Sequence, residues 1–210
     1  MSIVKFIEAV RLMPHYTNGG SRRHELEVGK LLEDNNFTRR DPKDTPFNGK
    51  NKSLYRDKLL STKGIEGLQD NSYYPQPMGT QNSPDFVVTC NGRSYLIECK
   101  SSKKDYPVYN SGLPKQDYIY IFSSMKENKT VTFLGSDIVT KTFIKNLKKL
   151  TDAIDNSIKD FNSLMDSTNS PAGLGFYCRS MFNHYQYISK NTYFDPKVIL
   201  KRNKKLNKFI

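Results

Sequence analysis

The chain has 210 residues, enough for one domain with a substantial core, although only 36% of them are hydrophobic. Its 33 Lys and Arg exceed its 21 Asp and Glu, which gives a net charge of +12 and favours a polyanionic partner such as nucleic acid. No apolar run approaches the roughly 18 residues of a membrane span, and no signal-type N-terminus is present. We therefore expect a cytoplasmic protein that does not engage membranes. A basic protein without a nucleic-acid partner can have the same composition.

The cysteines and histidines exclude several kinds of site. Three cysteines are present and none is spaced as a pair, so reduced, buried thiols are expected rather than disulfides or a zinc knuckle. The histidines are scattered along the chain, which argues against a zinc cluster and against a histidine-centred hydrolase.

Two helices are predicted near the N-terminus. The first is amphipathic and spans 2–12, and the second spans 21–37 with Ser21 as its N-cap. On the second helix Glu25 shares the inward face with Leu32. A carboxylate on an apolar face has two explanations, either a role in a functional site or an acid favoured by the helix dipole in the first turn.

A long polar segment over 38–60 is predicted to be a surface loop, because it is rich in Asn, Asp and Pro. It carries many cations, including Arg39 and Arg40, so it is either a loop that contacts DNA or a surface excursion without a function. A second loop is expected over 70–83, leading into the first strand of a hairpin.

The hairpin is predicted around Asn91-Gly92, a dipeptide that two-residue turns favour because both positions need positive φ. An apolar run led by Asp85 precedes the turn, and the run that follows it ends at Lys100. Because side chains alternate along a strand, Glu98 and Lys100 must share one face.

This pattern suits metal-dependent phosphodiester hydrolysis. Mg²⁺ takes oxygen ligands, usually one or two carboxylates with water and substrate phosphate, and Asp85 and Glu98 can supply both carboxylates from neighbouring strands. Lys100 would lie beside the attacking water and stabilise charge on the phosphoryl oxygens.

Pro84-Asp85, followed after twelve residues by Glu98-Cys99-Lys100, resembles the signature of the PD-(D/E)XK nucleases, which include most type II restriction endonucleases. The tripeptide of acid, any residue and lysine also occurs at three other places, which are Asp41-Pro42-Lys43, Glu127-Asn128-Lys129 and Asp195-Pro196-Lys197. Only the copy ending at Lys100 closes an apolar run and follows an acid-led strand. The alternative is an ordinary surface hairpin whose Glu98 and Lys100 face solvent.

The resemblance is specific over 84–100 and weaker over 21–135, and it does not extend to the C-terminal part of the chain. It implies a restriction-endonuclease-like α/β core, with a central mixed β-sheet flanked by helices. It also implies a Mg²⁺ cofactor held by Asp85 and Glu98, with Lys100 as a catalytic residue and Glu25 assisting from the preceding helix.

Two further strands are expected after the hairpin, over 117–123 and 130–135, and they would complete a four-stranded series. The polar loop before them, 101–116, follows the tripeptide as a similar loop does in restriction enzymes. Its candidate DNA contacts are Lys103, Asn110 and Lys115.

A long helix is predicted over 136–161, with apolar residues repeating at three and four positions. Packing of this apolar stripe on the chain's own sheet is the expected explanation, and an interface is the alternative. Residues 173–188 combine aromatic residues with side chains able to read base edges, which are Arg179, Asn183, His184 and Gln186. The tail, 197–210, is a basic amphipathic element that either contacts phosphate or is a solvated helix.

We thus expect one nuclease domain over 1–210, with a catalytic core over about 21–161 and a recognition segment over 162–210. The leading hypothesis is a type II restriction endonuclease acting on double-stranded DNA as a homodimer. A Holliday-junction or repair nuclease of the same superfamily and a non-catalytic DNA-binding protein are the alternatives.

Overall fold

The computed structural model describes residues 2–15, 20–44, 67–80, 82–109, 112–167, 176 and 193–210. In these residues a mixed six-stranded sheet runs in the order β1-β2-β3-β4-β5-β6. The strands are β1 (Thr38–Arg39), β2 (Ser72–Pro75), β3 (Phe86–Cys90), β4 (Arg93–Ser102), β5 (Ile119–Ser124) and β6 (Lys129–Leu134). The pairs β1/β2 and β4/β5 are parallel, and the other pairs are antiparallel. The expected mixed sheet with helices is confirmed at this level.

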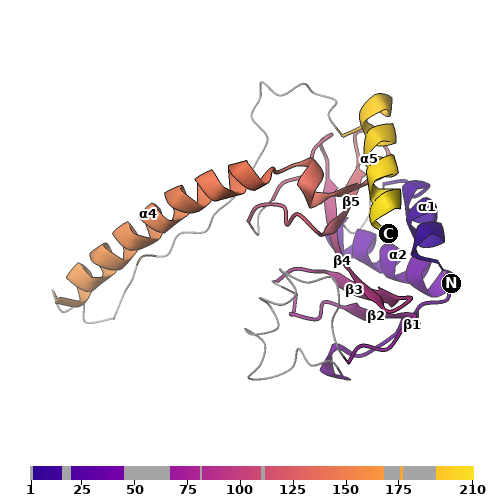
Figure 1. Cartoon of the computed structure of the whole chain (residues 1–210), viewed down its shortest axis with the longest axis horizontal. Helices are drawn as coiled ribbons and strands as arrows, with labels where there is room; N and C mark the ends of the chain where they lie inside the picture. Colours follow the sequence, from indigo (N-terminus) through magenta and orange to yellow (C-terminus); the bar gives the residue numbers. More distant parts are fainter. Residues whose placement is uncertain are drawn as a thin grey trace.

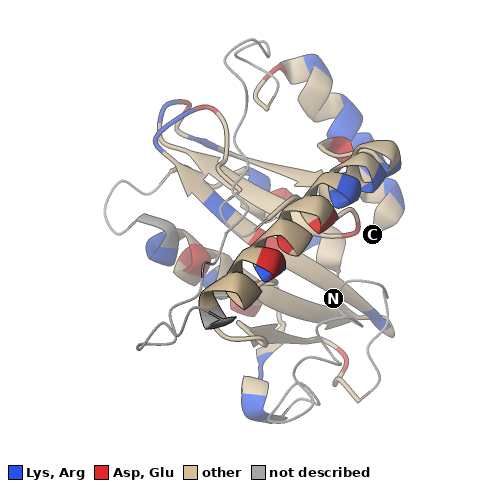
Figure 2. Ribbon diagram, turned by 90° about the vertical axis from the view of Figure 1, so that its left-hand side faces the viewer, with Lys and Arg blue, Asp and Glu red and all other residues tan. Residues whose placement is uncertain are grey.

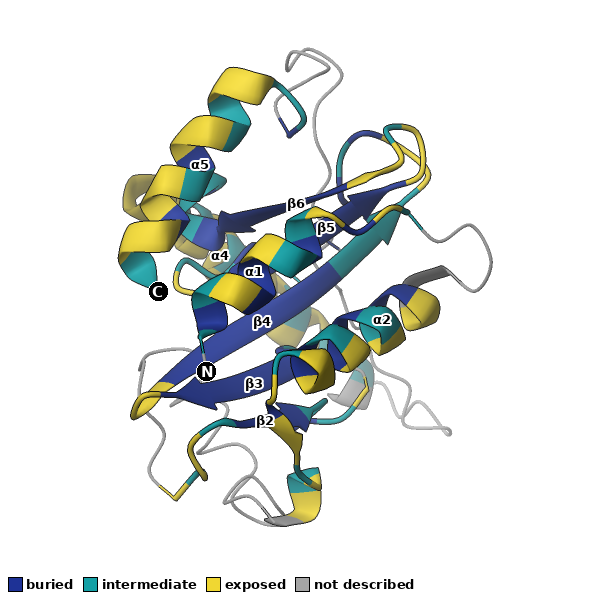
Figure 3. Ribbon diagram, turned by 90° about the vertical axis from the view of Figure 1, so that its right-hand side faces the viewer, coloured by how far each residue is buried: buried dark blue, intermediate teal, exposed yellow. Residues whose placement is uncertain are grey.

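The helices that accompany the sheet are α1 (Ile3–Arg11), α2 (Gly20–Asp34), α4 (Lys141–Ser167) and α5 (Pro196–Phe209), with short 3-10 turns η1 (Pro42–Asp44) and η3 (Gly135–Asp137). Helices α1 and α2 cover one face of the sheet, and α5 lies at its β6 side (Figure 3). Helix α4 begins near β6 and extends away from the sheet (Figure 1).

Hydrophobic cores lie on both faces of the sheet, because successive strand residues point to opposite sides. Beneath α1 and α2, the buried side chains include Phe6, Leu32 and Ile97. The opposite face is largely aromatic and includes Tyr120 and Phe133, whose rings stack at 5.4 Å. The sheet is thus a central layer buried on both sides.

The predicted hairpin is confirmed. Asn91 and Gly92 form its turn with φ values of 53° and 70°, the left-handed conformation that the dipeptide favours. Strands β5 and β6 also lie where strands were expected, within two residues. The buried, free Cys90 and Cys99 agree with the expectation of reduced thiols.

The loop predicted over 70–83 is partly wrong, because it contains β2. Tyr73 and Tyr74 are each only 3% exposed and point to opposite faces of the sheet. Nearby Pro and Asn residues resemble loop chemistry, but antiparallel pairing with β3 buries both tyrosines and outweighs that local preference. Thr38–Arg39, expected in a loop, pairs with β2 as β1.

The limits of two helices differ from those predicted. Helix α2 already includes Gly20, so Ser21 lies inside the helix rather than at its N-cap. Helix α4 begins later than expected because η3 comes first, and it continues beyond residue 161 to Ser167.

The packing predicted for the long helix is wrong. Phe143, Leu150 and Phe161 are 50%, 57% and 48% exposed instead of lying against the chain's own sheet. By contrast, the basic amphipathic tail is a helix, α5, capped by Asp195. No helix in the described ranges is long and apolar enough to cross a membrane.

Candidate active site

Asp85 and the tripeptide Glu98-Cys99-Lys100 lie next to each other where β3 begins beside β4. Phe86 lies opposite Ile97, so Asp85 is placed next to Glu98 one step further along the pair. Neighbours of this kind on antiparallel strands present their side chains on the same face. Asp85, Glu98 and Lys100 therefore gather on one face of the sheet.

Asp85 is held by its neighbours on both sides. Its Oδ2 accepts a hydrogen bond from the Cys99 backbone N–H at 2.7 Å, and its carbonyl oxygen accepts one from Gln76 N–H at 2.6 Å. Burial, helped by the negative charge of Glu98, raises the pKa of Asp85 to about 8. Two close carboxylates in a poorly solvated place favour either a shared proton or a cation.

Glu98 and Lys100 form an ion pair of 2.8 Å between Oε1 and Nζ, with side chains only 7% and 13% exposed. The second oxygen of Glu98, Oε2, is buried and has no hydrogen-bond partner. Leaving a charged acceptor unsatisfied is costly, so such an atom calls for a ligand. The solvent-facing hairpin considered as an alternative is excluded by this burial.

Glu25 approaches the same site from α2. Gln76 Nε2 donates to Glu25 Oε2 at 3.1 Å, so one residue of the β2–β3 connection touches both Glu25 and Asp85. Burial raises the pKa of Glu25, and the charge of Glu98 adds to this effect. Glu25 thus belongs to the electrostatic environment of the two strand carboxylates.

The donor set suits a hard divalent cation. No group of three or more His, Cys, Asp or Glu side chains arranged for a metal is found in the described part of the chain. Mg²⁺ does not need one, because it commonly takes one or two carboxylates and completes its shell with water and phosphate oxygens. Asp85 and the unsatisfied Oε2 of Glu98 fit that requirement.

Sequence reasoning missed Gln76, which lay in a predicted loop, and the surroundings of Lys115. Lys115 Nζ donates to Ser83 Oγ, two residues before Asp85, and lies 5.4 Å from the centre of the Tyr118 ring. Burial, together with the charge of Glu98, raises the pKa of Tyr118. Lys115, predicted as a DNA contact, therefore contacts the segment that leads into Asp85.

The other predicted DNA contacts are less centrally placed. Arg39 is exposed on β1 and lines a surface groove together with Arg22, Glu25 and Gln76. Arg40 is half-buried, and Lys103 is exposed just after β4. The remaining candidates lie outside the described residues, and they are Asn110, Arg179, Asn183, His184 and Gln186.

The N-terminal histidines lie away from the carboxylates. His15 Nε2 is 3.1 Å from Ser101 Oγ. Ser101 follows Lys100 in β4, so the two side chains point to opposite faces of the sheet. His24 is 2% exposed, with Nε2 3.4 Å from the carbonyl oxygen of Ile121. The hydrogen-bond partners of their rings are thus Ser101 and Ile121 and not Asp85 or Glu98.

Comparisons with protein-family models, with curated proteins and with solved structures find no match. The residues themselves are therefore the evidence on function. Their main features are the paired carboxylates, the adjacent ammonium group and the unsatisfied buried oxygen.

Proposed function

We propose that this protein is a Mg²⁺-dependent endonuclease that hydrolyses phosphodiester bonds in double-stranded DNA, in the manner of a type II restriction endonuclease. The observation that supports the proposal best is the buried Oε2 of Glu98, which has no hydrogen-bond partner although Oε1 of the same carboxylate pairs with Lys100. A purely structural ion pair would leave no reason for a second buried carboxylate beside it.

The carboxylates and the lysine have separate roles in the proposed reaction. Asp85 and Glu98 would hold Mg²⁺, which when bound supplies a Lewis acid for the phosphoryl oxygens and lowers the pKa of a ligated water. The hydrogen bond from Cys99 fixes the Asp85 carboxylate in place before substrate arrives. Lys100 is held by Glu98 Oε1, so its ammonium group can orient the attacking water and offset negative charge on the scissile phosphate.

Glu25 and Lys115 complete the proposed site. With its raised pKa, Glu25 is suited to hold a water molecule by hydrogen bonding and to accept its proton. Lys115 adds a second cation near Ser83, on the strand-leading side of the site. The net charge of +12 would draw the DNA backbone toward this surface.

The direct test is digestion of long, unmethylated phage DNA by the purified protein, with Mg²⁺ and with EDTA. We expect discrete fragments in Mg²⁺ only. Asp85→Asn keeps an oxygen that can accept the Cys99 hydrogen bond but removes the charge, and it should abolish cutting. Asp117→Asn makes the same change at an exposed acid near β5, so it is the matched control and should cut normally.

Other results would redirect the proposal. Cutting confined to branched DNA would indicate a junction or repair nuclease with the same chemistry. Tight DNA binding with no cleavage in any divalent cation would contradict a nuclease and indicate a binding protein.

A further inference from the structure

Helix α4 carries an exposed apolar stripe that the sheet does not cover. Its positions follow one another at alternating steps of four and three residues, and only Ser157 among them is polar. They are Phe143, Leu147, Leu150, Ile154, Ser157, Phe161 and Leu164. We call these seven positions the α4 seam. This 4–3 spacing over three heptads is the pattern by which one helix packs lengthwise against another.

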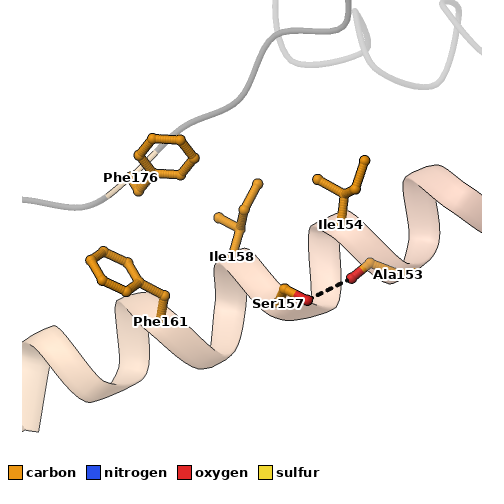
Figure 4. A pocket seen from close by; sticks show the side chains of 6 residues that line it. All are labelled: Ala153, Ile154, Ser157, Ile158, Phe161 and Phe176. Atoms are coloured by element: carbon orange, nitrogen blue, oxygen red, sulfur yellow. Dashed lines mark hydrogen bonds between the residues drawn. The ribbon is translucent and has the colours of Figure 1, made fainter.

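The seam remains exposed even where another part of the chain approaches it. Phe176 packs edge-on against Phe161 at 6.4 Å, and its backbone exchanges two hydrogen bonds with the Asn162 side chain, of 2.7 and 3.1 Å. Ile154 and Ile158 point to the same side as these rings, into an open apolar hollow (Figure 4). Phe161 and Phe176 are still 48% and 56% exposed.

The charges of α4 are strongly ordered along its length. Residues 141–150 hold four lysines and no acid, whereas residues 151–167 hold four aspartates and one lysine. Lysines therefore cluster in the half nearer the body and aspartates in the outer half (Figure 2). This order opposes the helix dipole, which favours acids at the N-terminal end and bases at the C-terminal end.

We propose that the α4 seam binds the α4 seam of a second copy of this chain in an antiparallel helix pair. An antiparallel pair places the lysine-rich half of each helix beside the aspartate-rich half of its partner, and it also opposes the two helix dipoles. A parallel pair would instead align lysines with lysines and aspartates with aspartates. The charge order that is unfavourable in one helix thus becomes favourable in two.

The exposed area is sufficient for such a pair. Five seam residues, Phe143, Leu150, Ile154, Phe161 and Leu164, are between 40% and 61% exposed. Half-exposed side chains of this size each leave roughly 100 Å² to bury. Two copies would remove on the order of 1,000 Å² from water, the area at which specific interfaces begin.

The first test measures the mass of the full-length protein by sedimentation over a wide concentration range, without DNA or metal. We expect a dimer that dissociates on dilution. Ile154→Lys introduces like charges near the middle of the seam and should give a monomer. Asn156→Lys adds the same charge on the exposed, opposite side of α4 and should leave the dimer intact.

Ile154 is 40% exposed, so its replacement is compatible with folding, which circular dichroism would verify. A wild-type monomer at every concentration, or a dimeric Ile154→Lys variant, would overturn the proposal. Neither result depends on nuclease activity, so this inference and the proposed function fail separately.

The second test measures the relative direction of the two α4 helices with spin labels. The labels are placed in a Cys178→Ser background, in which the other two cysteines, Cys90 and Cys99, are buried. Labels at Asp152→Cys lie near the centre of an antiparallel pair and should be close together. Labels at Lys145→Cys should be separated by on the order of 20–30 Å, since the axial rise is 1.5 Å per residue. Equal, short distances at both positions would mean a parallel pair and would contradict the proposed direction.

Discussion

At the scale of single residues, Glu98 is the most informative side chain of the site. One of its oxygens pairs with Lys100, while the other is buried without a hydrogen bond beside the acid Asp85. A cation bound there would satisfy the free oxygen and remove the repulsion that raises the pKa of Asp85. Metal binding is therefore expected to change the protein's stability as well as its activity.

The first prediction concerns metal binding by itself. Mg²⁺ should raise the melting temperature of the wild type. At a hundredfold excess over Kd, binding adds about 2.7 kcal/mol to the free energy of unfolding. Glu98→Gln should abolish this rise, because it removes the charge of the buried carboxylate. Glu127→Gln alters the same kind of tripeptide in the β5–β6 turn and should keep the full response in the same thermal-shift assay.

Lys100 should matter for cleavage and not for DNA affinity. Lys100→Ala is expected to lower kcat by about 10²–10³-fold, the usual cost of losing one group that stabilises charge in the transition state. Lys129→Ala, at the end of the Glu127-Asn128-Lys129 tripeptide, removes an exposed lysine and should cleave normally. Retained cutting by Lys100→Ala would reject the role assigned to Lys100, and gel-shift binding would separate affinity from chemistry.

At the scale of elements, the connection before β5 packs at Lys115 against Gly135, the first residue of η3. A Cβ placed on Gly135 would lie 1.9 Å from the carbonyl oxygen of Lys115, a contact that only movement of the backbone can relieve. The same short stretch carries Lys115, which contacts Ser83, and Tyr118, whose pKa is raised by burial and by the charge of Glu98. We therefore expect the packing at Gly135 to determine the position of Lys115.

Gly135→Ala should destabilise the protein by about 1–3 kcal/mol, the usual cost of overpacking, and should slow cleavage by displacing Lys115. Gly29→Ala is the matched control, because its Cβ would meet atoms no closer than 3.7 Å. Alanine there should stabilise α2 by up to about 1 kcal/mol. Urea unfolding measures both effects, and equal stabilities for the two variants would contradict the steric explanation.

His24 should make the contact between α2 and β5 sensitive to acid. Burial lowers the pKa of His24 to about 4, below the value of about 6.5 expected in the unfolded chain. The unfolded state therefore takes up a proton first as pH falls from about 6.5 toward 4, so stability falls over that window, by on the order of 3 kcal/mol in full. His24→Gln should flatten the decline in urea midpoint between pH 6.5 and about 5, and an unchanged slope would contradict it.

Local sequence patterns predicted the elements whose own residues determine them. Asn91-Gly92 favours the two-residue turn that it forms, and the alternation of side chains in β4 places Glu98 and Lys100 on one face. Strand β2 was not predicted, because its tyrosines are buried only through pairing with β3, which is a long-range contact. Gln76, which bridges Glu25 and Asp85, was missed for the same reason.

The stripe on α4 shows a different limit. Its spacing suits packing against another surface, and the spacing is the same whether that surface is the chain's own sheet or another molecule. Only the path of α4 away from β6 separates these two cases (Figure 1).

At the scale of the whole molecule, cutting both DNA strands should depend on the α4 seam. On the proposed function, Ile154→Lys should convert supercoiled plasmid to nicked circles, with little linear product, because each monomer carries one site. Asn156→Lys should give linear DNA like the wild type. Agarose-gel time courses measure the nicked and linear products. Equal amounts of linear product from both variants would mean that double-strand cleavage does not depend on the α4 seam.

The edges of the sheet bear on how copies of this protein can associate. One edge ends in β1, which is only two residues long, and at the other side α1 and α5 pack against β6. Short edge strands offer little template for adding a further strand, which is the usual route to fibrous aggregates. Association through a helix related by a two-fold axis closes after two copies. On the proposed pairing of α4 seams, a crowded solution of this protein would hold finite, reversible pairs and not growing polymers.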